Sequence, residues 1–459
     1  MAEPAPSARP QDADPAGWTR TQIALCLGIT GLALVLRLCR IEQWSWSAGE
    51  ATTFRLLTAP LGGPDGLFRG AQGWSPLGYL GLRGLTGLGV LPMHGEGWLR
   101  LPCGFVGGLL APLLVLVGRP LLGAAGALLA GLLVAVHPLL LATSQTADPV
   151  GFALLLALAA LGGWANGWRK VAVVGFVLAG LCAPFAWLFA GVVLAARLPE
   201  RAQRAGWGAV AVVVALGLPW WLPAVTWPLA LAAVVGAVWQ PQPIVRALTL
   251  VPLAAAVLAT WLGDRQDLLA FAGVVPGAAA SAAAGLVGLF SSARATLAAQ
   301  GRAGLVGAAL PTLVVLVWLA VDGFLYLTVY RGGRTPWRQA ADAVWVAANQ
   351  RGGLVVGAEA GAPSLTCYLR PRHWQSRTHD PHPGIAVLPL DLGAAAPFAA
   401  LAERQEGAVL LVLRQDELER LPAAVAQQLG ADFELLRIVP SPQAHGDDTL
   451  SIYRRARSR

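Results

Sequence analysis

Three charged side chains stand apart in otherwise apolar stretches of this chain and are of types that can do chemistry. Glu50 lies at the start of a predicted short helix, just after a Trp-Ser-Trp triplet. Arg100 precedes a long apolar run, and Asp148 stands directly before Pro149 at the start of another. A carboxylate in such surroundings can take the proton of an attacking hydroxyl, and a guanidinium can hold an anion. Each also has a purely structural interpretation, since carboxylates cap helices and arginines reach back to lipid headgroups.

The composition indicates that these side chains belong to a membrane protein. Of 459 residues, 56% are hydrophobic and 13% are charged, whereas soluble proteins average about 45–50% and about 25%. The net charge of +8 comes almost wholly from arginine, and the arginines of the first 330 residues lie singly between apolar runs, so we expect no nucleic acid partner. The five cysteines show no CxxC spacing, and the histidines around the prolines of loop 370–384 need no ligand to explain them. We therefore expect no metal site.

Runs of about 20 apolar residues, the length that crosses a hydrocarbon core of roughly 30 Å, divide most of the chain. Residues 1–20 are predicted to be a disordered cytoplasmic tail, and residues 21–330 a transmembrane domain. The fold class that we expect is mostly α, a polytopic membrane helical bundle. Its spans, about 11 in number, are predicted near residues 21–39, 99–117, 121–141, 149–165, 171–185, 186–197, 207–224, 227–240, 247–262, 268–290 and 304–329.

The stretch 76–92 is left out of these spans because Arg83 lies at its middle, where a lipid-facing arginine costs roughly 2.5–3.5 kcal/mol. We predict a helix at the membrane surface instead. With a cytoplasmic N-terminus, this choice sends the first loop, 40–98, outward together with Glu50, Asp148 and Asp322. It also places the basic clusters inside, as the positive-inside rule expects. These clusters are Arg119, Arg169 with Lys170, Arg197 with Arg201 and Arg204, Arg246, and Arg294 with Arg302.

Residues 331–459 are more polar and, after an odd number of spans, are predicted to form a soluble extracytoplasmic α/β domain. A helix over 336–350 comes first. Strands are expected at 354–357, 385–388, 409–413, 434–439 and 450–453, with helices over 395–403 and 415–429 between some of them. Such alternation is typical of a layered α/β fold.

Several short motifs in the first third of the chain occur in an order that resembles a known family. Arg37-Leu38 ends the first span, and a segment from Trp46 leads to Glu50. A Ser-Pro-Leu-Gly-Tyr segment at 75–79, Glu-Gly-Trp-Leu-Arg-Leu-Pro at 96–102 and Ser-Gln at 144–145 follow. This ordered set resembles the multi-spanning glycosyltransferases of the GT-C fold. In particular, it is similar to the family 39-like group of protein O-mannosyltransferases and lipid A aminoarabinose transferases.

The resemblance implies transfer of one sugar from a polyprenyl-phosphate carrier to a glycan, lipid or protein acceptor at the outer face of the cell (inner) membrane. Such a reaction needs a carboxylate base and cations that hold the departing phosphate. It requires no cofactor, because the lipid phosphate is the leaving group. Whether the reaction needs a divalent metal ion stays an open question at this point. We therefore assign Glu50 and Asp148 as candidate catalytic residues. Arg37, Arg83 and Arg100 are the candidate lipid-phosphate ligands.

The chain also departs from the pattern of this family. Gly49 stands where the family has the aspartate that is the usual candidate for the base. Ser75 replaces a proline, Gln72 stands near where an acidic residue is common, and Asp148 lies close to where an arginine is usual. These departures motivate a second hypothesis, a non-catalytic relative that acts as a binding or assembly subunit.

A secondary transporter is a third hypothesis for so apolar a chain. It predicts charged or helix-breaking residues paired at mid-membrane in two matching halves. The polar residues of the first 330 positions gather instead at one predicted face, and the two halves do not match. The sequence thus favours a transferase over a transporter.

Overall fold

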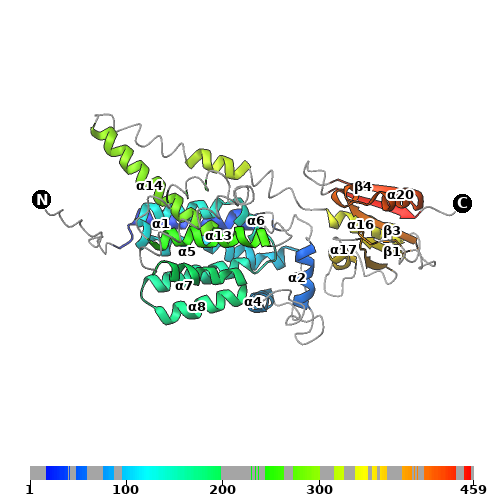
Figure 1. Cartoon of the computed structure of the whole chain (residues 1–459), viewed down its shortest axis with the longest axis horizontal. Coiled ribbons are helices and arrows are strands. Elements are labelled where there is room, and N and C mark those ends of the chain that lie inside the picture. Colours follow the sequence, from blue (N-terminus) through cyan, green and yellow to red (C-terminus); the bar gives the residue numbers. More distant parts are fainter. Residues whose placement is uncertain are drawn as a thin grey trace.

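The computed structural model shows a helical bundle and a smaller α/β domain, which follow one another along the long axis of the molecule (Figure 1). The residues that it describes are 17–39, 41, 48–58, 76–86, 96–197, 229, 233, 236, 243–262, 272–299, 315–324, 336–349, 354–358, 362–369, 385–394, 397–398, 401, 408–440 and 449–455. The predicted span at 207–224 and the whole histidine loop at 370–384 lie outside these residues.

The first span is α1 (Arg20–Leu38). Its start is fixed by a reciprocal cap, in which the Thr19 hydroxyl accepts a hydrogen bond from the N–H of Gln22 and the Gln22 side chain accepts one from the N–H of Thr19. Much of its surface is apolar and exposed, with Leu27 at 66% and Val35 at 64%. An exposed apolar surface of this kind suits contact with lipid.

The long helix α5 (Glu96–Val136) holds two predicted spans joined by a reversal at Gly123. The φ of Gly123 is 70°, a conformation that glycine adopts readily. The two halves pack against each other, since a Cβ atom on Gly131 would overlap Val115 and lie 3.0 Å from the carbonyl oxygen of Ala111. In a straight helix these positions would be roughly 24–30 Å apart. The predicted spans 99–117 and 121–141 are therefore separate, although the second is broken at His137, between the end of α5 and the start of α6.

The bundle continues with shorter helices around one apolar core. They are α6 (Pro138–Ser144), α7 (Val150–Ala165), α8 (Arg169–Cys182), the 3₁₀ turn η2 (Pro184–Ala186), α9 (Trp187–Ala195), α13 (Pro243–Leu262), α14 (Val275–Ala299) and a helix over 315–324. Among the described helices, α1, α5 and α14 are long and apolar enough to cross a membrane. One prediction is corrected here: Arg246 was expected in a loop before the span at 247–262, but it lies within the first turn of α13.

Two of the arginines predicted to face the cytoplasm, Arg119 and Arg197, pack on tryptophan rings. Arg119, in the reversal of α5, lies over the ring of Trp18, 4.7 Å from its centroid. Arg197, after α9, lies over Trp164 at the end of α7, 4.5 Å from the centroid. The opposite end of the bundle holds the C-terminus of α1 and the N-termini of α5 and α7. The two ring contacts place Arg119 and Arg197, while Arg201, Arg204 and Arg302 lie outside the described residues. The predicted grouping of all the basic clusters and the direction in which the bundle faces stay predictions.

Two short helices of the first loop cover the opposite end: α2 (Ala48–Thr58) and α4 (Pro76–Thr86). The second lies close against the bundle, because a Cβ on Gly78 would be 2.5 Å from Cβ of Pro149 and 3.1 Å from the carbonyl oxygen of Cys182. With 11 residues, α4 is roughly 16 Å long, which is too short to cross a membrane. Residues 87–92 lie outside the described part of the chain, so the interpretation of 76–92 as a surface helix stays a prediction.

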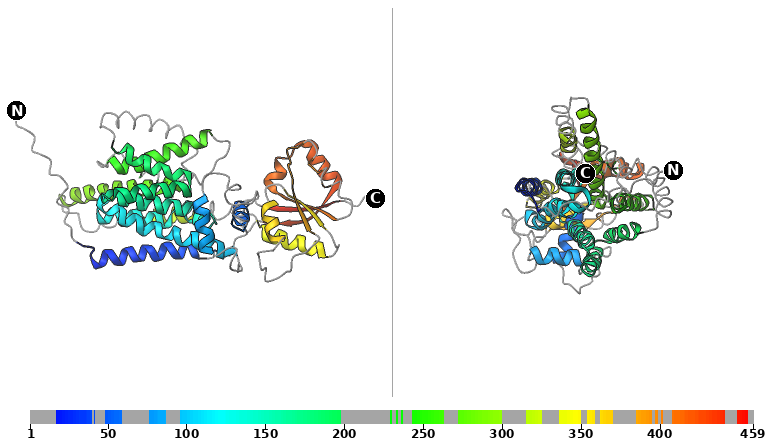
Figure 2. Two further views of the ribbon diagram at one scale, coloured as in Figure 1. Left: turned by 90° about the horizontal axis from the view of Figure 1, so that it is seen from below. Right: turned by 90° about the vertical axis from the view of Figure 1, so that its left-hand side faces the viewer.

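The C-terminal domain is built on a mixed five-stranded sheet in the order β2-β1-β3-β5-β4. β1 (Leu354–Ala358), β2 (Ile385–Pro389) and β3 (Ala408–Arg414) are parallel, while β4 (Phe433–Val439) and β5 (Leu450–Arg455) pair in antiparallel fashion. One face carries α16 (Trp337–Asn349) and α17 (Ala362–Leu369), and the other carries α20 (Ala423–Asp432) (Figure 2). A short helix, α19 (Gln415–Glu419), follows β3 directly.

The sequence predicted all five strands and the first helix of this domain to within two residues. The helix predicted over 415–429 was wrong as a single element, because it splits into α19 and α20 where Pro422 precedes the second helix. Helix α17 was not predicted, since Pro363 interrupts an eight-residue apolar segment. Most of the predicted helix 395–403 lies outside the described residues.

Candidate functional site

The candidate site lies at the end of the bundle that α2 and α4 cover. A separate apolar cluster holds these helices in place, and it consists of Ala51, Phe54, Leu56, Leu57, Leu82, Leu99, Cys103 and Ala147. Cys367 and Tyr368 of α17 pack against the same cluster, so the C-terminal domain contacts the first loop here. The cluster therefore fixes the polar groups among these helices relative to both domains.

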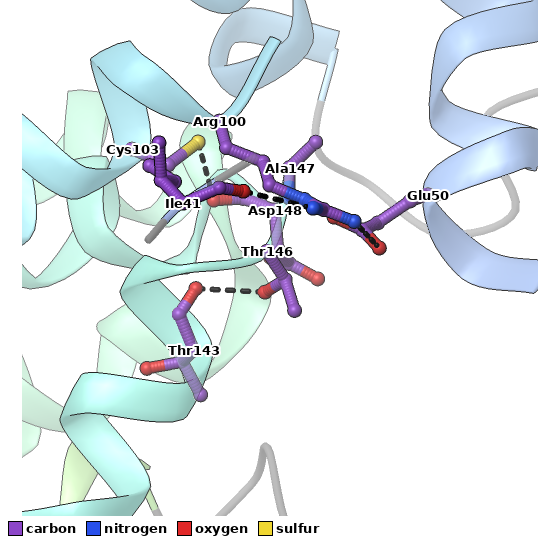
Figure 3. Close-up of polar contacts among 8 residues, drawn as sticks. All are labelled: Ile41, Glu50, Arg100, Cys103, Thr143, Thr146, Ala147 and Asp148. Carbon is purple, nitrogen blue, oxygen red and sulfur yellow. Dashed lines mark hydrogen bonds and ion pairs between the residues drawn. The ribbon is translucent and has the colours of Figure 1, made fainter. Parts of the chain in front are cut away.

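Glu50 and Arg100 form a buried, two-pronged ion pair at the centre of this site (Figure 3). Nε of Arg100 lies 2.6 Å from Oε1 of Glu50, and Nη2 lies 2.8 Å from Oε2. The two side chains are 3% and 0% exposed. Two parallel hydrogen bonds between planar groups give the strongest and most directional form of ion pair, which suits a site where a lone charge is costly to bury.

Both members of the pair also bind backbone of other elements. Nη1 of Arg100 donates to the carbonyl oxygen of Ile41, just after α1, at 3.0 Å. Oε1 of Glu50 accepts a hydrogen bond from the N–H of Ala147 at 3.2 Å. The pair thus connects the end of α1, α2, the start of α5 and the segment before α7. Neither backbone partner gives a signal in the sequence, because any residue type supplies the same groups.

Asp148 follows Ala147 directly and is half-buried. The N-cap of α7 is Pro149 rather than the predicted Asp148, but Oδ1 of Asp148 accepts a hydrogen bond from the N–H of Val150, the first residue of that helix, at 2.9 Å. Its carbonyl oxygen accepts a hydrogen bond from the thiol of Cys103 at 3.3 Å. Of the two predicted catalytic carboxylates, Asp148 is therefore the more exposed.

Tyr79 of α4 and Thr53 of α2 are the polar side chains that the sequence analysis missed. They are hydrogen-bonded to each other, and Asp148 is close enough to act on Tyr79 through its charge. Burial, followed by the negative charge of Asp148, raises the pKa of Tyr79, while the bond with Thr53 works in the opposite direction. The position of Tyr79 at the end of the Ser-Pro-Leu-Gly-Tyr segment was the sequence feature that could have indicated it as a site residue.

Arg37 is fully buried and donates to three carbonyl oxygens. Nη1 lies 3.2 Å from the oxygen of Ala33 and 2.8 Å from that of Ala135, and Nη2 lies 3.0 Å from that of Val134. In a continuous helix the Val134 oxygen would accept from residue 138, but Pro138 has no N–H. Arg37 therefore supplies the donor that the break between α5 and α6 removes.

Arg83 is half-buried on α4, the most accessible of the three arginines assigned to lipid phosphate. Asp322, predicted to face outward, is 1% exposed and accepts a hydrogen bond from Nε1 of Trp318 at 3.0 Å. Within the described part of the chain, no three His, Cys, Asp or Glu side chains are grouped so that they could hold a metal ion. The roles assigned to Glu50, Asp148, Arg37, Arg83 and Arg100 stay predictions.

Comparison with solved structures identifies the architecture. The chain superposes on the oligosaccharyltransferase of Archaeoglobus fulgidus, solved with a tethered acceptor peptide, with a TM-score of 0.54 at 11% identity. The match covers 96% of this chain and 74% of that one. The chain has the GT-C fold. The sequence resemblance is thus confirmed at the level of the fold.

Two structures of ArnT from Cupriavidus metallidurans are also similar to this GT-C chain. The apo structure has a TM-score of 0.49 at 14% identity and covers 95% of this chain and 97% of that one. The structure bound to undecaprenyl phosphate has a TM-score of 0.48 at 14% identity, with 96% and 99% covered. No family model and no curated protein matches the sequence.

Proposed function

We propose that this GT-C protein is a membrane glycosyltransferase that moves one sugar from a polyprenyl-phosphate carrier to a hydroxyl group of a glycan, lipid or protein acceptor. The bundle is proposed to lie in the cell (inner) membrane, with a cytoplasmic N-terminus and an extracytoplasmic C-terminal domain. Support comes from the GT-C fold, the ordered motifs of the first third of the chain, and the cluster of acidic and basic groups at one end of the bundle.

The single observation that carries the proposal is a half-buried carboxylate, Asp148, beside a buried ion pair on this fold. In the proposed step Asp148 takes the proton of the acceptor hydroxyl as its oxygen attacks the anomeric carbon of the sugar. The bond from that carbon to the phosphate oxygen breaks, and the polyprenyl phosphate leaves with the electron pair. Partial exposure lets a carboxylate meet an acceptor while its neighbours keep it in place.

Asp148 suits the role of base better than Glu50 does. Both oxygens of Glu50 lie within hydrogen-bond distance of Arg100, and Oε1 also accepts from the N–H of Ala147, so both oxygens already have donors. The Glu50 side chain is also 3% exposed. An acceptor would have to displace a buried guanidinium to reach it, at the cost of an uncompensated buried charge.

Among the predicted phosphate ligands, Arg83 suits that role best. Arg37 and Arg100 are both 0% exposed and donate to carbonyl or carboxylate oxygens of the chain itself. Arg83 is more accessible and lies on α4, the helix that also carries Tyr79. We propose that Arg83 meets the carrier phosphate at the rim of the site.

The proposal predicts that Asp148→Asn lowers transfer by a factor of 10² or more. Asparagine keeps an oxygen that can accept from the N–H of Val150, so the start of α7 is preserved while the base is lost. The measurement is the turnover of a polyprenyl-phosphate sugar by the purified protein in lipid nanodiscs. Asp342→Asn, which removes an exposed carboxylate of α16, is the control and keeps full turnover.

Gly49 favours the alternative of a non-catalytic subunit, because it stands where the resembling family has its usual base. Gly49→Asp separates the two functions in the same assay. If the protein as it stands turns over donor and Asp148→Asn does not, the transferase is supported. If neither the native chain nor Gly49→Asp turns over donor, the proposed reaction is wrong and the subunit is favoured.

A further inference from the structure

The Glu50 carboxylate bridges two parts of the chain that are far apart in sequence. Its Oε1 accepts one hydrogen bond from Nε of Arg100 in α5 and one from the N–H of Ala147, 97 positions along the chain from Glu50. Figure 3 shows Arg100 extended between Ile41 and Glu50, with Ala147 and Asp148 beside it. The ion pair therefore faces the backbone of the segment that carries the proposed base.

Side chains hold two backbone groups of that segment. The N–H of Ala147 donates to Glu50, and the carbonyl oxygen of Asp148 accepts from the thiol of Cys103 at 3.3 Å. Oδ1 of Asp148 in turn accepts from the N–H of Val150. The Glu50 contact adds a hydrogen bond to the apolar packing of Ala147 against α2 and α4, and so joins this segment to the first loop, whereas Cys103 and Val150 belong to the bundle helices α5 and α7.

Charge keeps the Glu50 carboxylate in position. A buried carboxylate has a high free energy unless a cation and hydrogen-bond donors compensate it, and here Arg100 supplies both. Arg100 is itself fixed by the carbonyl oxygen of Ile41 at 3.0 Å. A network in which each group has its partner is rigid, and removal of one member leaves the others uncompensated.

We propose that Glu50 and Arg100 are positioning residues, which hold Asp148 in place through the N–H of Ala147. This inference rests on the proposed function for the role of Asp148, but the mechanical link between Glu50 and residues 147–148 stands without it. In this scheme neither Glu50 nor Arg100 touches the reacting atoms. The scheme differs from the assignment of Glu50 as base and Arg100 as phosphate ligand.

The two assignments predict different kinetics. If Glu50 positions Asp148, Glu50→Gln lowers kcat about 10- to 100-fold and leaves the acid limb of the pH profile in place, because Asp148 still titrates. Arg100→Gln lowers kcat in the same range with little change in the KM for the lipid donor. Glu50→Asp and Arg100→Lys, which keep the charges, recover part of kcat. A base role for Glu50 instead removes the acid limb, and a phosphate role for Arg100 raises the donor KM.

A second measurement tests the link independently of turnover. Hydrogen–deuterium exchange of the peptide spanning 141–152 is compared in the native protein, Glu50→Gln, Glu50→Asp and the control Asp342→Asn. We expect severalfold faster exchange at this peptide in Glu50→Gln, a smaller change in Glu50→Asp and none in the control. The peptides of the C-terminal sheet report on global folding and stay unchanged in all four.

Unchanged exchange at 141–152 in Glu50→Gln, or loss of the acid limb in that variant, overturns the positioning role. A different result is possible: Glu50→Gln exchanges faster only at 141–152, and the native protein turns over no donor. In that case the link is supported and the transferase proposal is not. If Glu50→Gln is globally unfolded, the conservative pair Glu50→Asp and Arg100→Lys decides through the position of the acid limb and the donor KM.

Discussion

At the scale of single residues, buried arginines in this bundle act on the backbone. Arg37 and Arg100 are both 0% exposed, and each donates to carbonyl oxygens at places where a helix ends or breaks. A backbone carbonyl in an apolar interior needs a hydrogen-bond donor. In a helix the carbonyl of Val134 would accept from the N–H of residue 138, but that residue is proline and has no N–H. The guanidinium, with five donors in a plane, satisfies several such groups at once.

Arg37→Leu is expected to lower stability by about 3 kcal/mol or more, because hydrogen bonds from a charged group to buried carbonyls are lost and the carbonyls stay buried. Arg37→Lys should lose less, since an ammonium still donates to some of these oxygens. Thermal unfolding in detergent measures the difference. Equal stability of Arg37→Leu and the native protein would contradict the structural role and favour the predicted phosphate ligand.

Tyr79 gives a pH prediction. Its pKa in the folded protein is raised above the ordinary value of about 10, first by burial and then by the charge of Asp148. The unfolded chain therefore loses this proton first as the pH rises. The stability that the neutral phenol contributes is complete below about pH 10 and is lost as the pH rises through the folded pKa.

The measurement is the thermal stability of the native protein and of Tyr79→Phe between pH 8 and 11. The native protein is expected to lose stability more steeply than Tyr79→Phe above about pH 10, because phenylalanine does not ionise. Parallel curves for the two proteins would show that the environment of Tyr79 does not favour its neutral form.

At the scale of elements, small residues set how closely the helices approach. α13 and α14 touch at Gly277, where a Cβ would overlap the carbonyl oxygen of Leu248. At the same contact the Thr249 hydroxyl donates to the Gly277 carbonyl oxygen at 2.8 Å and lies 2.6 Å from the Ser281 hydroxyl. Small residues and hydroxyls at a shared face are the usual means by which helices associate in lipid.

Gly277→Ala is expected to destabilise the bundle by about 1–3 kcal/mol, since the added methyl must push a backbone carbonyl rather than a mobile side chain. Gly288→Ala on the same helix is the matched control. A Cβ there meets nothing within 4 Å, so the exchange should be neutral or slightly stabilising. Thermal unfolding of both variants tests this, and an equal effect at the two positions would rule out the close contact of α13 and α14.

At the scale of the whole molecule, the contact of α17 with α2 joins the C-terminal domain to the first loop among the described residues. The thiol of Cys367 in α17 lies 3.6 Å from the carbonyl oxygen of Ala51 in α2, and Tyr368 packs on the same apolar cluster. Ala51 adjoins Glu50. The C-terminal domain therefore contacts the candidate site directly, which also requires both regions to lie on one side of the membrane.

This contact predicts that Ala51→Cys forms a disulfide with Cys367 under mild oxidation, in a protein whose other four cysteines are replaced by serine or alanine. Mass spectrometry of the joined peptides provides the measurement. Leu435→Cys, on the exposed face of β4, is the control and should not pair with Cys367. If the joined 51–367 peptide is absent while both thiols are intact and reduced, the contact between α2 and α17 is wrong.

The sequence alone determined the membrane character, most helix positions, all five strands and the GT-C resemblance, because these follow from local hydrophobic period and from motif order. It also brought forward Glu50, Arg100 and Asp148 as isolated charges. Only the tertiary structure decided how they meet: Glu50 with Arg100 across 50 positions, and Glu50 with the N–H of Ala147 across 97. Pairing across such distances depends on packing of helices, and backbone partners leave no trace in residue type.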